Sequence, residues 1–212
     1  MEVKDSKGRI TTELLHFSFA TAQDITRLMR WRRFARGEGN PRKILSTSLV
    51  KTAVIKWRDA KDNRQVANHW RDVLAHLSSN ASAEIHFLFV AKAPWSKLAK
   101  LLGFCLMHRT WSNSICLDDL GMHPLLIDNP KEPISGVGTA IFYHSLCIAT
   151  AIEAATVWGE TTPESVGFYR GLCEGKKIDD LLFFTAEEYI KLRQELERKL
   201  PVHRQTEGHK NV

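Results

Sequence analysis

The sequence predicts a mixed α/β (α+β) protein that folds as one domain over residues 1–212. Apolar residues make up 43% of the chain and charged residues 25%, which is typical of a globular protein. Runs of aromatic and β-branched residues gather in the middle of the chain, and helical periodicity dominates on either side of them. A chain of this length buries on the order of 70% of its unfolded surface, so it needs no disulfides.

The first 80 residues are predicted to hold one strand and three helices. Residues 13–20 are short and aromatic, as strands often are. Thr21 can cap a helix that ends before the stretch 37–41. Residues 42–80 are expected to form two more helices, inserted before the second strand, with Trp57 and Trp70 in the core. In the later helix an apolar stripe at helical spacing predicts one buried face: Val66, His69, Trp70, Val73, Leu74 and Leu77.

Three strands are predicted next, because aromatic and β-branched residues concentrate at 84–91, 103–111 and 114–123. Residues 111–114 have the composition of a tight turn between the last two strands. The three runs are therefore expected to form an antiparallel meander. Residues 124–133 are expected to form a loop.

The C-terminal part is predicted to alternate helices with strands. We expect a helix at 136–155, a strand at 156–160, a short helix at 163–172 and a strand at 181–184. Thr185 can cap a C-terminal helix at about 186–200, whose acidic first turn and basic last turn suit the helix dipole. Residues 203–212 are expected to fray.

The four cysteines form no C-x-x-C pair, and no His/Cys cluster has the spacing of a zinc site. Most of them lie in apolar runs, so we expect reduced thiols, no metal and a cytoplasmic location. The N-terminal residues are polar, which argues against a signal peptide. No apolar stretch reaches 18 residues, so no membrane segment is expected.

The net charge of +6 is unevenly distributed. Residues 22–66 contain 12 Lys and Arg against 4 Asp and Glu, a local excess of +8. The predicted first helix carries several of these cations: Arg27, Arg30, Arg32, Arg33 and Arg36. A surface for a polyanion, such as a phosphorylated cofactor, RNA or an acidic protein, is one explanation, and a solvated helix face is the other.

Two glycines, Gly136 and Gly138, open the long helix predicted at 136–155. The unpaired N–H groups of a first helical turn, together with the helix dipole, suit a pyrophosphate, although a structural turn also explains such a pair. A Rossmann fingerprint is excluded because its third glycine is replaced by Ile141. A P-loop is excluded because no Lys or Arg follows Gly138 before Arg170.

The chain resembles the GNAT superfamily of acetyl-CoA-dependent N-acetyltransferases over residues 84–172, and more loosely over 13–36. Residues 118–124 match the D-D-L-x-V-x-P pattern that ends the fourth strand of that family. Residues 133–138 match its [QR]-x-x-G-x-[GA] pyrophosphate loop, except that Pro133 replaces the Arg or Gln. A later pattern of the type T-x-x-S-x-x-F-Y is matched by Thr162, Ser165, Phe168 and Tyr169.

The resemblance implies a central mixed, mostly antiparallel twisted sheet flanked by helices. It implies direct transfer of an acetyl group from the co-substrate acetyl-CoA to a primary amine. Tyr169 would be the general acid for the leaving thiolate, and Asp118 a candidate general base, with His123 and Glu160 as alternatives. Asp118 and Asp119 adjoin on one strand, so they are expected to point to opposite faces. Acetyl-CoA would be bound by Leu120, Gly121, Met122, Ser135, Gly136, Val137, Gly138, Thr139, Ala140, Thr162 and Ser165.

Two other classes of function stay open. The same fold acts on macromolecules in some members of the superfamily, and the basic segment 22–66 would then dock an aminoacyl-tRNA or an acidic protein. A non-catalytic module that binds CoA is the other alternative, because the loop lacks its Arg or Gln. Whether the chain forms a homodimer is left open by the sequence.

Overall fold

A computed structural model of the protein describes residues 2–4, 10–34, 39–127 and 134–200. Its main sheet has seven strands. Six of them follow one another in the order β3 (His16–Phe19), β5 (Ile85–Lys92), β6 (Leu101–Arg109), β7 (Ser114–Met122), β8 (Thr156–Glu160) and β9 (Leu181–Thr185). The seventh, β4 (Val66–Ala67), pairs with β5. Neighbours along the row are antiparallel except β7 and β8, so the predicted mixed, mostly antiparallel sheet is confirmed.

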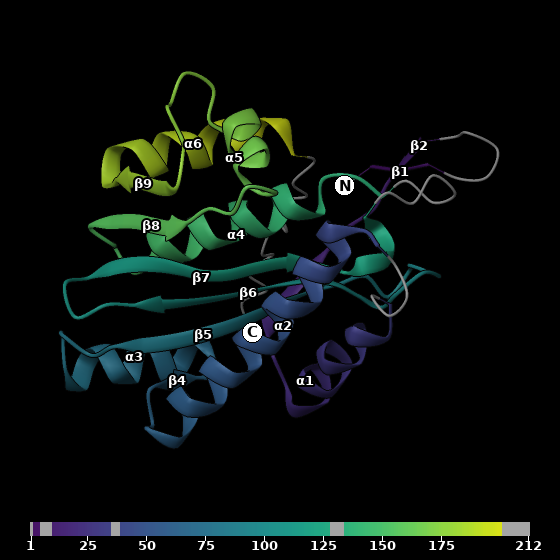
Figure 1. Ribbon diagram of the computed structural model, residues 1–212. Coiled ribbons are helices and arrows are strands. Elements are labelled where there is room, and N and C mark those ends of the chain that lie inside the picture. Colours follow the sequence, from purple (N-terminus) through teal and green to yellow (C-terminus); the bar gives the residue numbers. More distant parts are fainter. Residues whose placement is uncertain (1, 5–9, 35–38, 128–133, 201–212) are drawn as a thin grey trace, which may run out of the picture.

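Helices cover both faces of this sheet, and Figure 1 shows α4 and α2 on opposite sides of β7. One face packs Leu88, Phe104 and Leu106 against α1 (Ala22–Met29), the 3-10 helix η1 (Arg30–Phe34) and α2 (Pro41–Asp62). The other face packs against α3 (Trp70–Ser79), α4 (Val137–Ala151) and α6 (Ala186–Lys199). Because apolar side chains of the central strands point to both faces, β5 and β6 are buried almost throughout.

The N-terminal helices follow the prediction in part. Thr21 caps α1 in a capping box with Asp24, as its position predicted. The later helix of segment 42–80 starts at Trp70, and Val66 belongs to β4 instead. The reason is a long-range contact, since the His86 N–H donates to the Gln65 carbonyl at 2.7 Å. The predicted stripe is also wrong at Leu74, which is 50% exposed, and at His69, which is exposed at the N-cap of α3.

The remaining elements lie close to their predicted positions. The turn at 111–114 is confirmed by the Thr110 N–H, which donates to the Ser114 carbonyl at 2.8 Å. Helix α4 ends four residues earlier than predicted, at Ala151, and the loop at 124–133 begins with the 3-10 helix η2 (Pro124–Leu126). Helix α5 (Val166–Leu172) starts three residues late, and Thr185 caps α6 as predicted.

A short antiparallel ribbon of β1 (Glu2–Lys4) and β2 (Ile10–Thr12) was not predicted, because these three-residue strands carry no clear alternation. The predictions for Arg36, for residues 128–133 and for residues 203–212 concern positions outside the described residues. All four cysteines are free thiols. Trp57 is buried as expected, whereas Trp70 is half-buried and packs against the core. No helix in the described part of the chain combines the length and the apolar character needed to cross a bilayer.

Candidate active site

The parallel strands β7 and β8 separate in the middle of the sheet. Their pairing covers four residues of each strand and ends at Leu117 opposite Gly159, although β7 continues to Met122. Backbone groups of successive strand residues point to alternate edges, and the His123 N–H donates to the Leu102 carbonyl on the β6 side. Leu120 and Met122 therefore direct their backbone groups to the edge that β8 leaves open, where the Met122 carbonyl accepts a hydrogen bond from the Ser46 hydroxyl of α2.

A β-bulge lies where the two strands separate. Asp119 pairs with Leu106 and Leu117 pairs with Met107, which leaves Asp118 without an opposite residue on β6. The extra residue shifts the alternation of side chains, so the prediction that Asp118 and Asp119 face opposite sides is wrong. Both carboxylates point toward α2, where the Lys56 ammonium lies 3.8 Å from Asp118 Oδ1 and 3.1 Å from Asp119 Oδ2.

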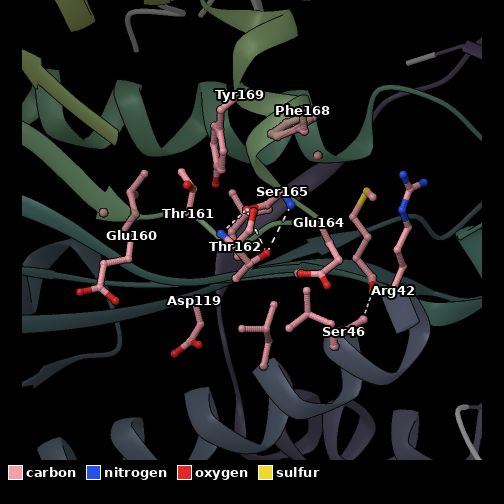
Figure 2. A pocket seen from close by; sticks show the side chains of 18 of the residues that line it. Arg42, Ser46, Asp119, Glu160, Thr161, Thr162, Glu164, Ser165, Phe168 and Tyr169 are labelled. Atoms are coloured by element: carbon pink, nitrogen blue, oxygen red, sulfur yellow. Dashed lines mark hydrogen bonds between the residues drawn. The ribbon is translucent and has the colours of Figure 1, made fainter. Parts of the chain in front are cut away.

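A cavity of about 770 Å³ opens beside this bulge. Its walls come from α2, β7, the start of α4, β8 and α5, as Figure 2 shows for several of their side chains. This volume is in the range of small-molecule and cofactor sites. Eight of the predicted site residues line the cavity: Asp118, Leu120, Gly121, Met122, Gly138, Thr162, Ser165 and Tyr169. The other five, which do not line it, are Ser135, Gly136, Val137, Thr139 and Ala140.

The glycines at the start of α4 have separate roles. Gly136 is the N-cap and has a left-handed φ of 80°, which favours glycine. Gly138 faces the cavity, where a Cβ atom would lie 3.3 Å from the Phe168 ring and 3.4 Å from the Met122 sulfur. The Ala140 N–H already donates to the Gly136 carbonyl at 2.9 Å. The free N–H groups of the first turn are therefore those of Val137, Gly138 and Thr139.

Tyr169 places its ring in the core and its hydroxyl at the cavity, as Figure 2 shows. The ring makes edge contacts with Phe142 and Phe168, at centroid distances of 5.5 and 5.0 Å. The residue is only 7% exposed, and this burial raises the pKa of Tyr169 above its ordinary value. A phenol is protonated near neutral pH with or without this shift, so the hydroxyl has a proton to donate, and burial makes it a weaker acid than a free phenol.

Thr162 and Ser165 line the cavity but hydrogen-bond mainly to each other. The Thr162 N–H donates to Ser165 Oγ at 2.8 Å, and the Ser165 N–H donates to Thr162 Oγ1 at 3.3 Å. These bonds fix the turn that leads into α5 and so position Tyr169. A binding role for the two hydroxyls stays a prediction.

The carboxylates at the bulge have different surroundings. Burial raises the pKa of Asp119 to about 6, although the Lys56 ammonium acts in the opposite direction. Asp118 lies with its Oδ2 2.7 Å from Nδ1 of His108, which the sequence analysis did not single out. The turn at 111–114 sets the hairpin register, which places His108 opposite Cys116, two residues before Asp118. The predicted turn therefore indicated that His108 and Asp118 would lie close together. Lys56 comes from α2, and no local pattern indicated its place.

The two alternative bases differ in position. His123 is buried between Trp31 and Phe34, accepts a hydrogen bond from the Leu125 N–H at 3.1 Å and does not line the cavity. Burial lowers the pKa of His123 to about 4. Glu160 is exposed and lies on the wall of the cavity at the end of β8.

A mixed, mostly antiparallel sheet flanked by helices is the arrangement that the GNAT resemblance predicts. Solved structures that match the chain include GNAT-family acetyltransferases. No protein-family model and no curated protein matches it.

Three of the matching structures illustrate the similarity. A GNAT-family acetyltransferase from Desulfovibrio desulfuricans is 12% identical, with a TM-score of 0.47, over 82% of this chain and 99% of that one. A GNAT-family acetyltransferase from Brucella melitensis, in complex with acetyl-CoA, is 13% identical, with a TM-score of 0.43, over 82% and 99%. A nourseothricin acetyltransferase is 18% identical, with a TM-score of 0.36, over 48% of this chain and 65% of its own length.

Proposed function

We propose that the protein is an acetyl-CoA-dependent N-acetyltransferase that moves the acetyl group directly from the CoA thioester to a primary amine. One observation carries this proposal. A single cavity joins Gly138 in the first turn of α4, the open edge of β7, the Tyr169 hydroxyl and the carboxylates of the bulge. Direct transfer needs a site for the donor, a proton donor for the leaving thiolate and a polar region for the amine.

The donor half of the cavity suits a pyrophosphate followed by a pantetheine arm. The N–H groups of Val137, Gly138 and Thr139 would bind the pyrophosphate, because the positive end of the helix dipole favours anions. These donors do not depend on side-chain identity, so the Pro133 departure from the family pattern leaves them in place. The Leu120 backbone groups and the Met122 N–H, at the edge that β8 leaves open, would hold the pantetheine and polarise the thioester carbonyl.

The chemistry follows from this placement. The uncharged amine nitrogen attacks the thioester carbonyl carbon, the carbon–sulfur bond breaks, and the electron pair leaves on the CoA sulfur. Tyr169 would give its proton to that thiolate. Asp118 would accept the proton that the amine loses, directly or through water. The products are the N-acetylated amine and CoA.

The charge of the cavity favours a cationic acceptor. Four carboxylates and two cations line it: Asp118, Asp119, Glu160, Glu164, Arg42 and Lys56. The acidic excess attracts an ammonium group, which then loses its proton at the site of reaction. This balance supports a primary amine as the acceptor.

The test is release of CoA thiol from acetyl-CoA with a panel of primary amines, together with calorimetric measurement of CoA binding. We expect CoA binding and amine-dependent thiol release, with mass spectrometry detecting an acetylated product. Hydrolysis that no amine accelerates, or binding of CoA without turnover, would favour the non-catalytic module.

A macromolecular acceptor is the second candidate, and the exposed cations of α1, η1 and α2 favour it. Helix α2 connects this surface to the cavity, because Arg42 and Lys56 line the cavity. An RNA acceptor would bind with an affinity that falls steeply as salt rises. Titration of tRNA at two salt concentrations tests this candidate, and a weak affinity that salt does not change would exclude it.

A further inference from the structure

Two histidines lie next to Asp118 on the sheet face that α2 covers. His86 on β5 is directly opposite His108 on β6, and their rings stack with centroids 4.9 Å apart and planes at 23°. Asp118 follows on β7, with Oδ2 2.7 Å from His108 Nδ1. Three adjacent strands therefore each contribute one metal-ligating side chain to the same place.

The ligand atoms of these three side chains are close enough to share an ion. One nitrogen from each imidazole and one carboxylate oxygen all lie within 4.8 Å of one another. Tetrahedral zinc, with bonds of about 2.0–2.2 Å, separates its ligand atoms by roughly 3.3 Å, so small rotations would suffice. The His86 Nδ1 atom is buried and has no hydrogen-bond partner among the described residues.

Charge and protonation suit a divalent cation here. Asp118 places a carboxylate beside the two imidazoles, with its Oδ2 2.7 Å from His108 Nδ1. Burial and the neighbouring His108 lower the pKa of His86, and the carboxylates of Asp118, Glu84 and Asp59 act in the opposite direction. The ammonium of Lys56 contacts the other oxygen of Asp118, at 3.8 Å.

We propose that His86, His108 and Asp118 form a binding site for a divalent transition-metal ion of the zinc class, with water in the remaining positions. Two imidazoles and one carboxylate are borderline donors that suit Zn²⁺ and Co²⁺ better than Mg²⁺ or Ca²⁺. The side chains of His108 and Asp118 are 21% and 14% exposed, so an ion can reach them. The site does not depend on the proposed acetyl transfer.

An occupied site would affect the neighbouring cavity. Asp118 lines that cavity, and a carboxylate that ligates a metal is no longer available as a base. The ion would therefore inhibit acetyl transfer where Asp118 takes the amine proton. His86 does not line the cavity, so the His86→Ala variant removes a ligand without changing the cavity wall.

The test is titration of the metal-stripped full-length protein with Zn²⁺ by calorimetry, and with Co²⁺ by visible absorption, in the absence of acetyl-CoA. We expect one site whose Co²⁺ spectrum reports nitrogen and oxygen ligands. His86→Ala and His108→Ala should each weaken binding by on the order of 100-fold, since even the loss of a second-shell partner typically costs 10–100-fold. The control His16→Ala removes an exposed histidine from β3 and should bind like the wild type.

Lys56→Met should change the metal affinity in the opposite direction. It removes a cation that competes for Asp118, so metal binding should become tighter, while Asp118→Asn should weaken it. Thermal unfolding of each variant shows whether it is folded. No saturable binding by the wild type, or equal binding by wild type, His86→Ala and His108→Ala, would overturn the site. Because no acetyl-CoA is present, that result leaves the proposed acetyl transfer untouched.

Discussion

At the scale of single residues, Tyr169 shows how one side chain can serve both packing and chemistry. Its ring belongs to the aromatic group with Phe142 and Phe168, and its hydroxyl is at the cavity. Removal of the hydroxyl oxygen from such a phenol leaves the packing of its ring unchanged. Substitution by phenylalanine therefore separates the two roles.

Tyr169→Phe should lower kcat by on the order of 10²-fold, because general acid catalysis typically contributes about 10²–10⁴-fold. The melting temperature and the affinity for CoA should stay nearly unchanged. Rate and thermal unfolding should be measured on one preparation. A kcat within about threefold of wild type, well below that range, would show that Tyr169 is a core residue without a catalytic role.

Substitutions at Gly138 test the proposed donor site. Gly138→Glu places a carboxylate at the first turn of α4, where the pyrophosphate would bind, so CoA affinity should fall by at least tenfold. Gly138→Ala is the matched control, since its Cβ would meet Phe168 and Met122 at 3.3–3.4 Å, a tight contact that adds no charge. Calorimetry with CoA measures both variants. Unchanged affinity in a folded Gly138→Glu protein contradicts the donor site.

At the scale of elements, α1 is joined to the sheet by a buried ion pair. Asp24 is 1% exposed, caps α1 through Thr21 and lies 2.8 Å from the Lys92 ammonium of β5. Burial alone would raise the pKa of Asp24, but the hydrogen bonds from Lys92 and Thr21 outweigh burial and lower it. The folded state therefore holds the ionised form more strongly than the unfolded chain does.

Asp24→Asn should reduce the free energy of unfolding by about 1.5–3 kcal/mol near pH 7, the range for hydrogen bonds to charged groups. A depressed pKa stabilises the folded protein at pH values above the pKa of the same group in the unfolded chain. This stabilisation is lost as the pH falls through the pKa of the folded state. The difference between wild type and variant should therefore shrink below about pH 4, the ordinary carboxyl value. Urea unfolding at several pH values measures it, and a difference that does not change with pH would contradict the ion pair.

Elements whose cause is local could be predicted from the sequence, and those with a long-range cause could not. The caps at Thr21 and Thr185 were predicted because their partners lie three residues away. The sequence predicts a helix where β4 lies, because local periodicity does not reveal the pairing of this strand with β5. The bulge at Asp118 was missed because an extra residue leaves no mark on an alternating pattern.

The residues of the candidate site likewise divide into those that contiguous motifs indicate and those that long-range contacts bring to it. Gly138, Leu120 and Tyr169 were found through a resemblance that covers contiguous motifs. Lys56 was not, because it reaches the bulge from α2, about 60 residues earlier in the chain. His108 depended on the hairpin register, which fixes the opposite residue only once the turn is known.

At the scale of the whole molecule, positive charge is concentrated on one face. The exposed arginines of α1 and η1 and several cations of α2 lie on the face opposite α4 and α6. Because α2 also contributes Lys56 and Arg42 to the cavity, this face adjoins the site of reaction. A ligand with phosphate groups would be attracted along it.

Reversing the charge of Arg30 and Arg33 together, as Arg30→Glu and Arg33→Glu, should raise the KM for acetyl-CoA or for an RNA acceptor severalfold at low salt. The effect should decline at high ionic strength, where the Debye length falls to about 3 Å at 1 M. Arg198→Glu, on the far face at the end of α6, is the control and should have little effect. Turnover that responds neither to the mutations nor to salt would mean that these arginines are only solvated.

The early end of the β7–β8 pairing also affects how the chain holds together. The walls of the cavity come from different stretches of sequence, α2 and β7 on one side and α4, β8 and α5 on the other, and only four residue pairs join β7 to β8. A ligand that touches both walls stabilises their association by RT ln(1 + [L]/Kd), about 2.7 kcal/mol at 100 times Kd. When a ligand fills the cavity, amide hydrogens on both of its walls should therefore exchange more slowly with solvent.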